Sequence, residues 1–297
     1  MANKGKYYES QFEEATIELL RETHWQYAFG DDIHRKYTDP LIEEDLRSFL
    51  ADQYKDKNLT SSEMDGIVAN LRNIGGQNDY YALRNTFLLY RDGYDFAYSD
   101  GRDNPFRLEY IDFKHPDHNI FRCVNQFVME QGRENRRPDI LLFINGIPVC
   151  IIELKNPTKQ NATIRDAHTQ ICTRYMRDIP VLLKYCALAV ISDGAKNALG
   201  TTYTPFEFFY EWKKIDNEDK AGKGLDTLRT LIRGALSPER ILEILRDYVY
   251  FPDPTKEDDT TEIVCRYPQF FATRKLRDHI LNHLRSVGGD GKGGTYF

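Results

Sequence analysis

The sequence has few cysteines and no long apolar segment. Its five cysteines are scattered, no two form a CxxC pair, and most lie within apolar runs: Cys123, Cys150, Cys172, Cys186 and Cys265. This usage is typical of reduced core cysteines and argues against a disulfide framework. Residues 1–14 lack an apolar signal segment, and no stretch approaches the ~20 apolar residues that a membrane span requires. We therefore expect a soluble cytoplasmic protein with no membrane partner.

The chain also lacks an overall positive charge. With 40 Lys and Arg against 46 Asp and Glu, its net charge is −6, whereas nucleic-acid affinity usually depends on basic surface. The distribution is uneven, because residues 131–177 contain eight basic residues (Arg133, Arg136, Arg137, Lys155, Lys159, Arg165, Arg174 and Arg177) and four acidic ones (Glu134, Asp139, Glu153 and Asp166). Ordinary variation along a protein surface also produces such a local excess, so the excess permits nucleic-acid binding without establishing it.

What is present is one strongly apolar hairpin, residues 136–157. Two runs rich in Ile, Val and Phe flank the turn signal Asn145-Gly146, and runs so continuous are typical of strands buried on both faces of an α/β sheet. Three charged residues interrupt them: Asp139 begins the first run, and Glu153 and Lys155 end the second. A charge at a buried strand end is costly unless it is paired or binds a metal. Glu153 and Lys155 are two residues apart, so they share one face of the strand.

The register of the hairpin decides whether Asp139 joins that face. A two-residue loop with regular pairing would place Asp139 opposite Ile152, on the wrong face. A three-residue connection or one bulge would place it opposite Glu153. Because Pro148 has no N–H to donate to a tight ladder, we predict the slipped register.

Two converging carboxylates would form a site for a divalent cation. Hard oxygen ligands suit such an ion, and the absence of nearby Cys or His argues against zinc. A cation held there can bind a phosphate oxygen and lower the pKa of a bound water, while Lys155 orients that water or offsets developing charge. This is the chemistry of phosphodiester hydrolysis, with Asp139, Glu153 and Lys155 as the catalytic set.

These residues resemble the PD-(D/E)xK nuclease motif, as Pro138-Asp139 and Glu153-Leu154-Lys155. The longer context resembles the N-terminal region of the restriction subunit of type I restriction-modification enzymes across essentially the whole chain. It comprises Arg137-Pro138-Asp139, Asn145-Gly146-Ile147-Pro148, Glu153-Leu154-Lys155-Asn156-Pro157, Arg174-Tyr175, Asp178-Ile179-Pro180 and Ser192-Asp193-Gly194. The resemblance implies Mg²⁺-dependent cleavage of double-stranded DNA, with Mn²⁺ able to substitute, in a bacterial or archaeal cell. It also implies methylation and specificity subunits as partners, and ATP binding by a motor domain in the full-length protein only.

The resemblance suggests further site residues. The carbonyl of Leu154 would be a metal ligand, and Glu13 matches a first-helix glutamate that reaches the metal in related nucleases; solvation alone would also explain Glu13. Some of these nucleases carry a QxxxY pair on the helix that we expect at residues 163–178. Gln170 fits that pattern, but Tyr175 follows one residue later than usual, so its role stays open. The basic residues that we expect to contact DNA are Arg136, Arg137, Lys159 and Arg174.

The predicted fold class is α/β, a restriction-endonuclease-like core with a central mixed sheet flanked by helices and a C-terminal helical extension. The nuclease domain would span residues 1–250, with a helical region at about 39–92. Residues 251–262 would be a linker, and the resemblance implies that residues 263–297 begin a motor domain in which Gln269 would contact adenine. No Walker A motif occurs, because Lys292 is followed by glycine.

Two alternatives remain beside this interpretation. The chain could be a DNA-binding or docking module with a silent nuclease site. The intact Asp139, Glu153 and Lys155 argue against this, because binding alone does not need a pair of metal ligands. The segment His115-Pro116-Asp117-His118 invites a metal interpretation, but a loop beside proline is preferred because no second cluster completes a ligand set. Whether residues 1–297 cleave DNA by themselves stays open.

Overall fold

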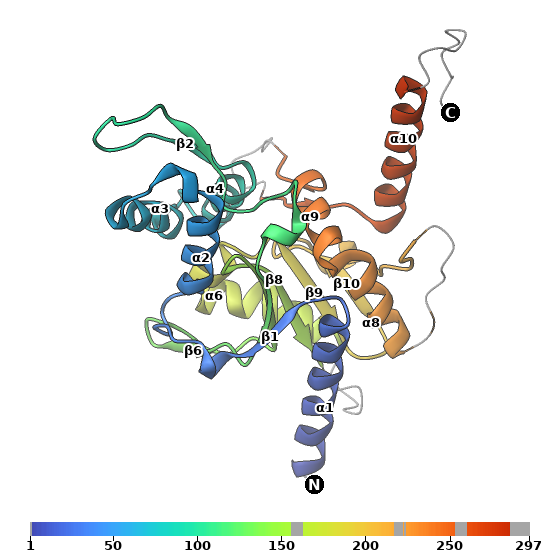
Figure 1. The fold of residues 1–297 in the computed structure, drawn as a ribbon. Coiled ribbons are helices and arrows are strands. Elements are labelled where there is room, and N and C mark those ends of the chain that lie inside the picture. Colours follow the sequence, from blue (N-terminus) through green and yellow to red (C-terminus); the bar gives the residue numbers. More distant parts are fainter. Residues whose placement is uncertain (1, 156–162, 217–221, 223, 253–259, 286–297) are drawn as a thin grey trace.

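The computed structural model describes residues 2–155, 163–216, 222, 224–252 and 260–285, and for residues 2–9 and 284–285 the backbone alone. One mixed β-sheet occupies its centre, and helices surround that sheet (Figure 1). The sheet order is β1-β4-β7-β8-β9-β10. β1 and β4 are parallel, as are β8 and β9, and the other neighbours are antiparallel.

The six strands of this sheet are β1 (Gln26–Phe29), β4 (Phe121–Asn125), β7 (Ile140–Ile144), β8 (Ile147–Leu154), β9 (Leu188–Ser192) and β10 (Asn197–Gly200). Three two-stranded ribbons lie outside it: β2 (Tyr94–Phe96) with β3 (Phe106–Leu108), β5 (Met129–Gln131) with β6 (Glu134–Arg136), and β11 (Val249–Tyr250) with β12 (Ile263–Val264).

The helices are α1 (Ala2–Arg21), α2 (Glu43–Gln53), α3 (Ser61–Asn73), α4 (Asp79–Asp92), α5 (Ile164–Thr169), α6 (Met176–Asp178), α7 (Pro180–Leu183), α8 (Leu225–Leu231), α9 (Pro238–Asp247) and α10 (Tyr267–Arg285). α2, α3 and α4 confirm the helical character of the 39–92 region. α5 and α6 are joined by a π-helical segment, Gln170–Tyr175, so the chain is continuously helical from residue 164 to 178.

Apolar side chains cover both faces of the sheet. On one face Leu142 and Ile152 share a core with Leu20 of α1 and with α8 and α9. On the other face Leu141 and Ile151 pack in a second core with the helical segment 164–183. The alternation of even and odd residues between the cores follows from the two-residue period of a strand. The α/β class with a mixed sheet and flanking helices is thereby confirmed, as is the C-terminal helical extension.

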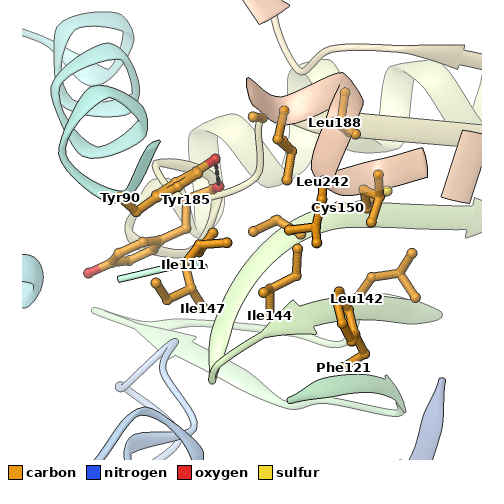
Figure 2. Close-up of a cluster of buried hydrophobic side chains, with 14 of the residues drawn as sticks. Tyr90, Ile111, Phe121, Leu142, Ile144, Ile147, Cys150, Tyr185, Leu188 and Leu242 are labelled. Atoms are coloured by element: carbon orange, nitrogen blue, oxygen red, sulfur yellow. Dashed lines mark hydrogen bonds between the residues drawn. The ribbon is translucent and has the colours of Figure 1, made fainter. Parts of the chain in front are cut away.

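The hairpin β7–β8 lies in the middle of the sheet and is buried along its whole length. Figure 2 shows its residues Leu142, Ile144, Ile147 and Cys150 among buried side chains from other elements, including Tyr90 and Tyr185. Because both faces are covered, a charged residue in this hairpin has to find its partners at the strand ends.

The hairpin turns tightly and then slips by one residue. Asn145 and Gly146 both have positive φ, 50° and 76°, and connect Ile144 directly to its partner Ile147, which fits a type I′ turn. A bulge then shifts the register between Leu142 and Phe143, so that Ile140 pairs with Ile152. The slipped register is confirmed, and it results from a bulge beside Pro148 rather than from a three-residue loop.

The proposed division into nuclease domain (1–250), linker (251–262) and start of a motor (263–297) stays a prediction. Residues 253–259 and 286–297 lie outside the described ranges. β11 ends directly before the linker region and β12 begins directly after it, and these two strands pair antiparallel.

Candidate active site

The acid at the start of β7 meets the end of β8. The register that pairs Ile140 with Ile152 brings Asp139 opposite Glu153. Asp139 Oδ2 accepts a hydrogen bond from the backbone N–H of Leu154 at 2.7 Å, and the Asp139 side chain is half-buried. Both arms of the hairpin therefore contribute a carboxylate to one end of the sheet, as the slipped register requires.

Glu153 is the buried acid of this site. Its side chain is 1 % exposed, and its two oxygens accept from Lys155 Nζ at 2.8 Å and from the Tyr175 hydroxyl at 3.2 Å. Burial raises the pKa of Glu153 to about 8, the neighbouring Asp139 carboxylate adds to the rise, and Lys155 opposes it. Glu153 thus lies where additional positive charge would stabilise its ionised form.

Lys155 lies on the same face as Glu153, which confirms the expected alternation, while Leu154 belongs to the opposite core. Its ammonium group also donates to Gln170 Oε1 at 2.8 Å. The Lys155 side chain is 14 % exposed. Gln170 therefore lies beside Lys155, and its catalytic role stays a prediction.

Tyr175 also belongs to the site, although the sequence left its role open. Gln170 Nε2 donates to the Tyr175 hydroxyl at 2.7 Å, and both residues lie in the π-helical segment. In a π-helix the hydrogen bonds run from residue i to i+5, so residues five apart can face the same side. The π-helix accommodates the one extra residue between Gln170 and Tyr175. The longer spacing in the sequence was the sign of this irregularity in the helix.

The donor set fits a hard divalent cation. Two carboxylates converge, one of them buried with a raised pKa, and the half-buried Asp139 opens the site toward solvent. Oxygen donors of this kind suit Mg²⁺ or Mn²⁺. The carbonyl of Leu154 as a further ligand stays a prediction, and the N–H of that residue is the group that binds Asp139.

Glu13 approaches this region from α1 but has other partners. Its carboxylate accepts from Asn125 Nδ2 at 2.8 Å and from Gln126 Nε2 at 2.9 Å. Gln126 in turn donates its backbone N–H to the Asp139 carbonyl at 3.4 Å. Glu13 is therefore connected to the backbone of the site through Gln126, and its role as a metal ligand stays a prediction.

The residues expected to contact DNA differ in their surroundings. Arg136 donates to Asp178 and Glu134, so its charge is already offset. Arg137 and Arg174 are exposed. Lys159 lies outside the described residues.

Residues 6–208 match the family described as Type I restriction enzyme R protein N terminus. The chain is 29 % identical over 288 residues to the "Type I restriction enzyme HindI endonuclease subunit" of Haemophilus influenzae, a match covering 92 % of this chain and 27 % of that protein. It is 26 % identical over 296 residues to the "Putative type I restriction enzyme MjaIXP endonuclease subunit" of Methanocaldococcus jannaschii, covering 92 % of this chain and 28 % of that protein.

The chain therefore spans little more than a quarter of the length of these two relatives. It is also similar to the "Type I restriction enzyme EcoprrI endonuclease subunit" of Escherichia coli, with 28 % identity over 221 residues, 71 % of this chain and 61 % of that sequence. Within the described ranges, no helix combines the length and the apolar character that a bilayer crossing needs.

Proposed function

Since the chain belongs to the Type I restriction enzyme R protein N terminus family, we propose that it is the Mg²⁺-dependent nuclease domain of a restriction enzyme and hydrolyses phosphodiester bonds of double-stranded DNA. The observation that carries the proposal is the meeting of Asp139, Glu153 and Lys155 at one end of the β7–β8 hairpin. Binding alone does not require two carboxylates and an ammonium group in this arrangement.

Each side chain has a definite task in this proposal. Asp139 and Glu153 would hold the ion, which when bound supplies a Lewis acid and an activated water. Lys155 orients the attacking water and offsets the negative charge that develops on the phosphate. Gln170 and Tyr175 are positioning residues, because they contact Lys155 and Glu153 through hydrogen bonds of 2.8 and 3.2 Å and are joined to each other by one of 2.7 Å.

The wider activity is proposed from the relatives. Two relatives named as type I restriction enzyme endonuclease subunits are more than three times as long as the region that matches this chain. We infer that this chain acts together with an ATP-driven translocase located C-terminal to it, and with methylation and specificity subunits. ATP would then bind only to the full-length protein, whereas Mg²⁺, or Mn²⁺ in its place, would bind to the residues described above.

The test is cleavage of plasmid DNA by the full-length protein with its partner subunits, Mg²⁺ and ATP. Asp139→Ala and Lys155→Ala should abolish cleavage while ATP hydrolysis continues. Asp52→Ala, which changes an exposed acid on α2, is the matched control and should cut like the wild type. If either site variant cuts as well as the wild type, the assignment fails.

The same experiment separates the nuclease from a docking module. A docking module with a silent site predicts DNA binding and ATP hydrolysis by the wild-type complex with no cleavage at any Mg²⁺ or Mn²⁺ concentration. Cleavage that depends on Asp139 and Lys155 excludes that alternative.

A further inference from the structure

A second group of potential metal ligands lies in the loop that precedes β4. Asp112 Oδ2 is 3.0 Å from Nδ1 of His115 and 3.0 Å from Nδ1 of His118. All three residues offer a ligand atom within 4.8 Å of one another. The carboxylate is buried, with 5 % of its side chain exposed, whereas the histidine side chains are 60 % and 51 % exposed. The arrangement is a buried acid beneath two accessible imidazoles.

The acid was not the one that the sequence suggested. The sequence groups His115 and His118 with Asp117, and it favours an ordinary loop because no second cluster completes a ligand set. Asp117 is exposed, and the structure instead brings in Asp112, three residues before the first histidine. The third ligand group therefore comes from immediately upstream of the histidine segment.

The loop is held in shape by its own backbone. Asp112 Oδ1 accepts from the N–H groups of Lys114 and His115 at 2.9 and 3.0 Å, which leaves Oδ2 directed at the two imidazoles. Asn119 closes the loop, because its side chain accepts from the Asp112 N–H and donates to the Asp112 carbonyl. The Asp112 carboxylate is thus positioned by contacts that do not involve Oδ2, the atom that faces both imidazoles.

The loop is also fixed to the central hairpin. Asn145 of the β7–β8 turn is fully buried and donates from Nδ2 to Asn119 Oδ1 at 2.8 Å and to the Tyr110 carbonyl at 3.0 Å. Its own Oδ1 accepts the N–H of Ile120 at 2.7 Å. Outer contacts of this kind orient metal ligands in known sites and strengthen metal binding.

The separations are close to those in a transition-metal site. Both carboxylate–imidazole contacts are hydrogen bonds of 3.0 Å in the metal-free chain, and an ion would replace them. With metal bonds of about 2.1 Å, two ligand atoms lie about 3.0 Å apart at right angles and about 3.4 Å apart at the tetrahedral angle of zinc. Two imidazoles with one carboxylate favour first-row transition ions such as Zn²⁺, Co²⁺ and Ni²⁺ over Mg²⁺ or Ca²⁺.

We propose that Asp112, His115 and His118 bind a divalent transition-metal ion, at a site separate from the cleavage site. Asp139 and Asn145 stand at opposite ends of β7, six residues apart, which corresponds to roughly 20 Å at the rise of a strand. The ion would hold the loop before β4 in its folded shape, while Asn119 and Asn145 join that loop to the turn of the hairpin, and water would complete the coordination of the ion on the exposed side. This site does not depend on the proposed nuclease function.

The test is zinc binding by the purified 1–297 chain, measured by competition with a chromophoric chelator. Three variants are compared with the wild type. His115→Gln/His118→Gln removes the proposed ligands. Asp139→Asn/Glu153→Gln alters the proposed cleavage site, and His279→Ala/His283→Ala removes a stacked histidine pair on α10, whose ring centroids are 5.0 Å apart.

We expect one tightly bound Zn²⁺ per chain in the wild type and in the last two variants, and a Kd at least about 100-fold weaker in His115→Gln/His118→Gln. Zinc should raise the Tm of the wild type but not of that variant, and Mg²⁺ at the same concentration should not displace the zinc. Because both histidines are exposed, Gln replacement leaves the folded chain available for measurement. Equal zinc affinity in His115→Gln/His118→Gln, loss of binding in His279→Ala/His283→Ala, or no zinc binding by the wild type overturns the proposal.

Discussion

The hydroxyl of Tyr175 donates to Glu153 Oε2 at 3.2 Å, and so links the helix that covers the sheet to the buried acid at the end of β8. The contact exists because the helix widens into a π-helix between Gln170 and Tyr175. Such single-turn irregularities are frequent at functional sites. Here the irregularity brings two positioning residues into the site from one helical face.

Tyr175→Phe should slow DNA cleavage by about 10-fold or more, the loss typical of removing an outer contact of a metal ligand. The Tyr175 hydroxyl lowers the pKa of Glu153, so its removal should also move the alkaline rise of the pH–rate profile to higher pH. Tyr250→Phe, at a side chain 60 % exposed on β11, is the control. Equal rates for Tyr175→Phe and the wild type at every pH would show that the hydroxyl has no part in the reaction.

Deletion of Thr173, which is exposed in the π-helical segment, should convert that segment to a regular α-helix. Gln170 and the tyrosine would then be four residues apart, which places them on one face of an α-helix. We expect the deletion variant to retain its fold and cut DNA within about tenfold of the wild-type rate. Circular dichroism and plasmid cleavage check this, and complete loss of cleavage with an intact fold would contradict it.

The stability of the metal-free chain should fall as pH rises from about 4.5 to about 8. Burial raises the pKa of Glu153 to about 8, so in this window the folded state holds a proton that the unfolded state has lost. Glu153→Gln removes this titrating group, so the stability of the variant should fall less over the same range. Urea unfolding from pH 5 to pH 9 in EDTA measures how the free energy of unfolding changes with pH in both proteins. Parallel slopes would show that the Glu153 carboxyl is not desolvated enough to raise its pKa.

Two adjacent arginines should behave differently when replaced by alanine. Arg136 Nε donates to Asp178 at 2.7 Å, and Asp178 is 2 % exposed but keeps Arg177 as a second partner. Arg136→Ala should therefore lower the urea midpoint, because Asp178 and Glu134 both lose a hydrogen-bond donor. Arg137 is exposed, so Arg137→Ala should leave the urea midpoint unchanged.

If Arg137 contacts a phosphate, Arg137→Ala should weaken DNA binding uniformly and reduce the slope of log K against log salt by about 1. Filter binding at several salt concentrations measures that slope. An unchanged slope would remove Arg137 from the proposed DNA contacts.

Gly146→Ala should be strongly destabilising. Gly146 has φ of +76°, and a Cβ there would lie 2.1 Å from the carbonyl oxygen of Ile42, so the substitution adds backbone strain to a steric clash. Gly66→Ala is the matched control on α3, where a Cβ meets nothing within 4 Å. It should stabilise the chain by about 0.5–1 kcal/mol, the usual gain in a helix. Equal midpoints for the two variants in urea would contradict this account of the turn.

The central part of the site followed from local rules. Glu153 and Lys155 had to share a face because a strand alternates its side chains, and Pro148 indicated that the ladder would be interrupted near the turn. The bulge beside Pro148 then placed Asp139 opposite Glu153. These inferences required no knowledge of distant parts of the chain.

Other features depend on long-range packing or on backbone variants that residue type does not specify. The role of Tyr175 does not follow from the sequence, because an α-helix turns residues five apart away from each other and residue type alone does not distinguish a π-helix from an α-helix. The Asp112 carboxylate lies beneath His115 because Asn119 and Asn145 hold the loop, and Asn145 is 26 residues away from Asn119. Contacts at that separation are fixed by the fold as a whole.

The start of α10 is inserted into the body of the protein. Phe270 is fully buried against Trp212 and Tyr248, at ring-centroid distances of 5.4 and 5.0 Å, and α10 extends away from the sheet beyond this point (Figure 1). A load applied along α10 would therefore be transmitted to the core through an aromatic anchor. The burial of Phe270 thereby fixes the direction in which α10 leaves the body of the protein, and the described part of α10 would turn with the sheet as one rigid lever.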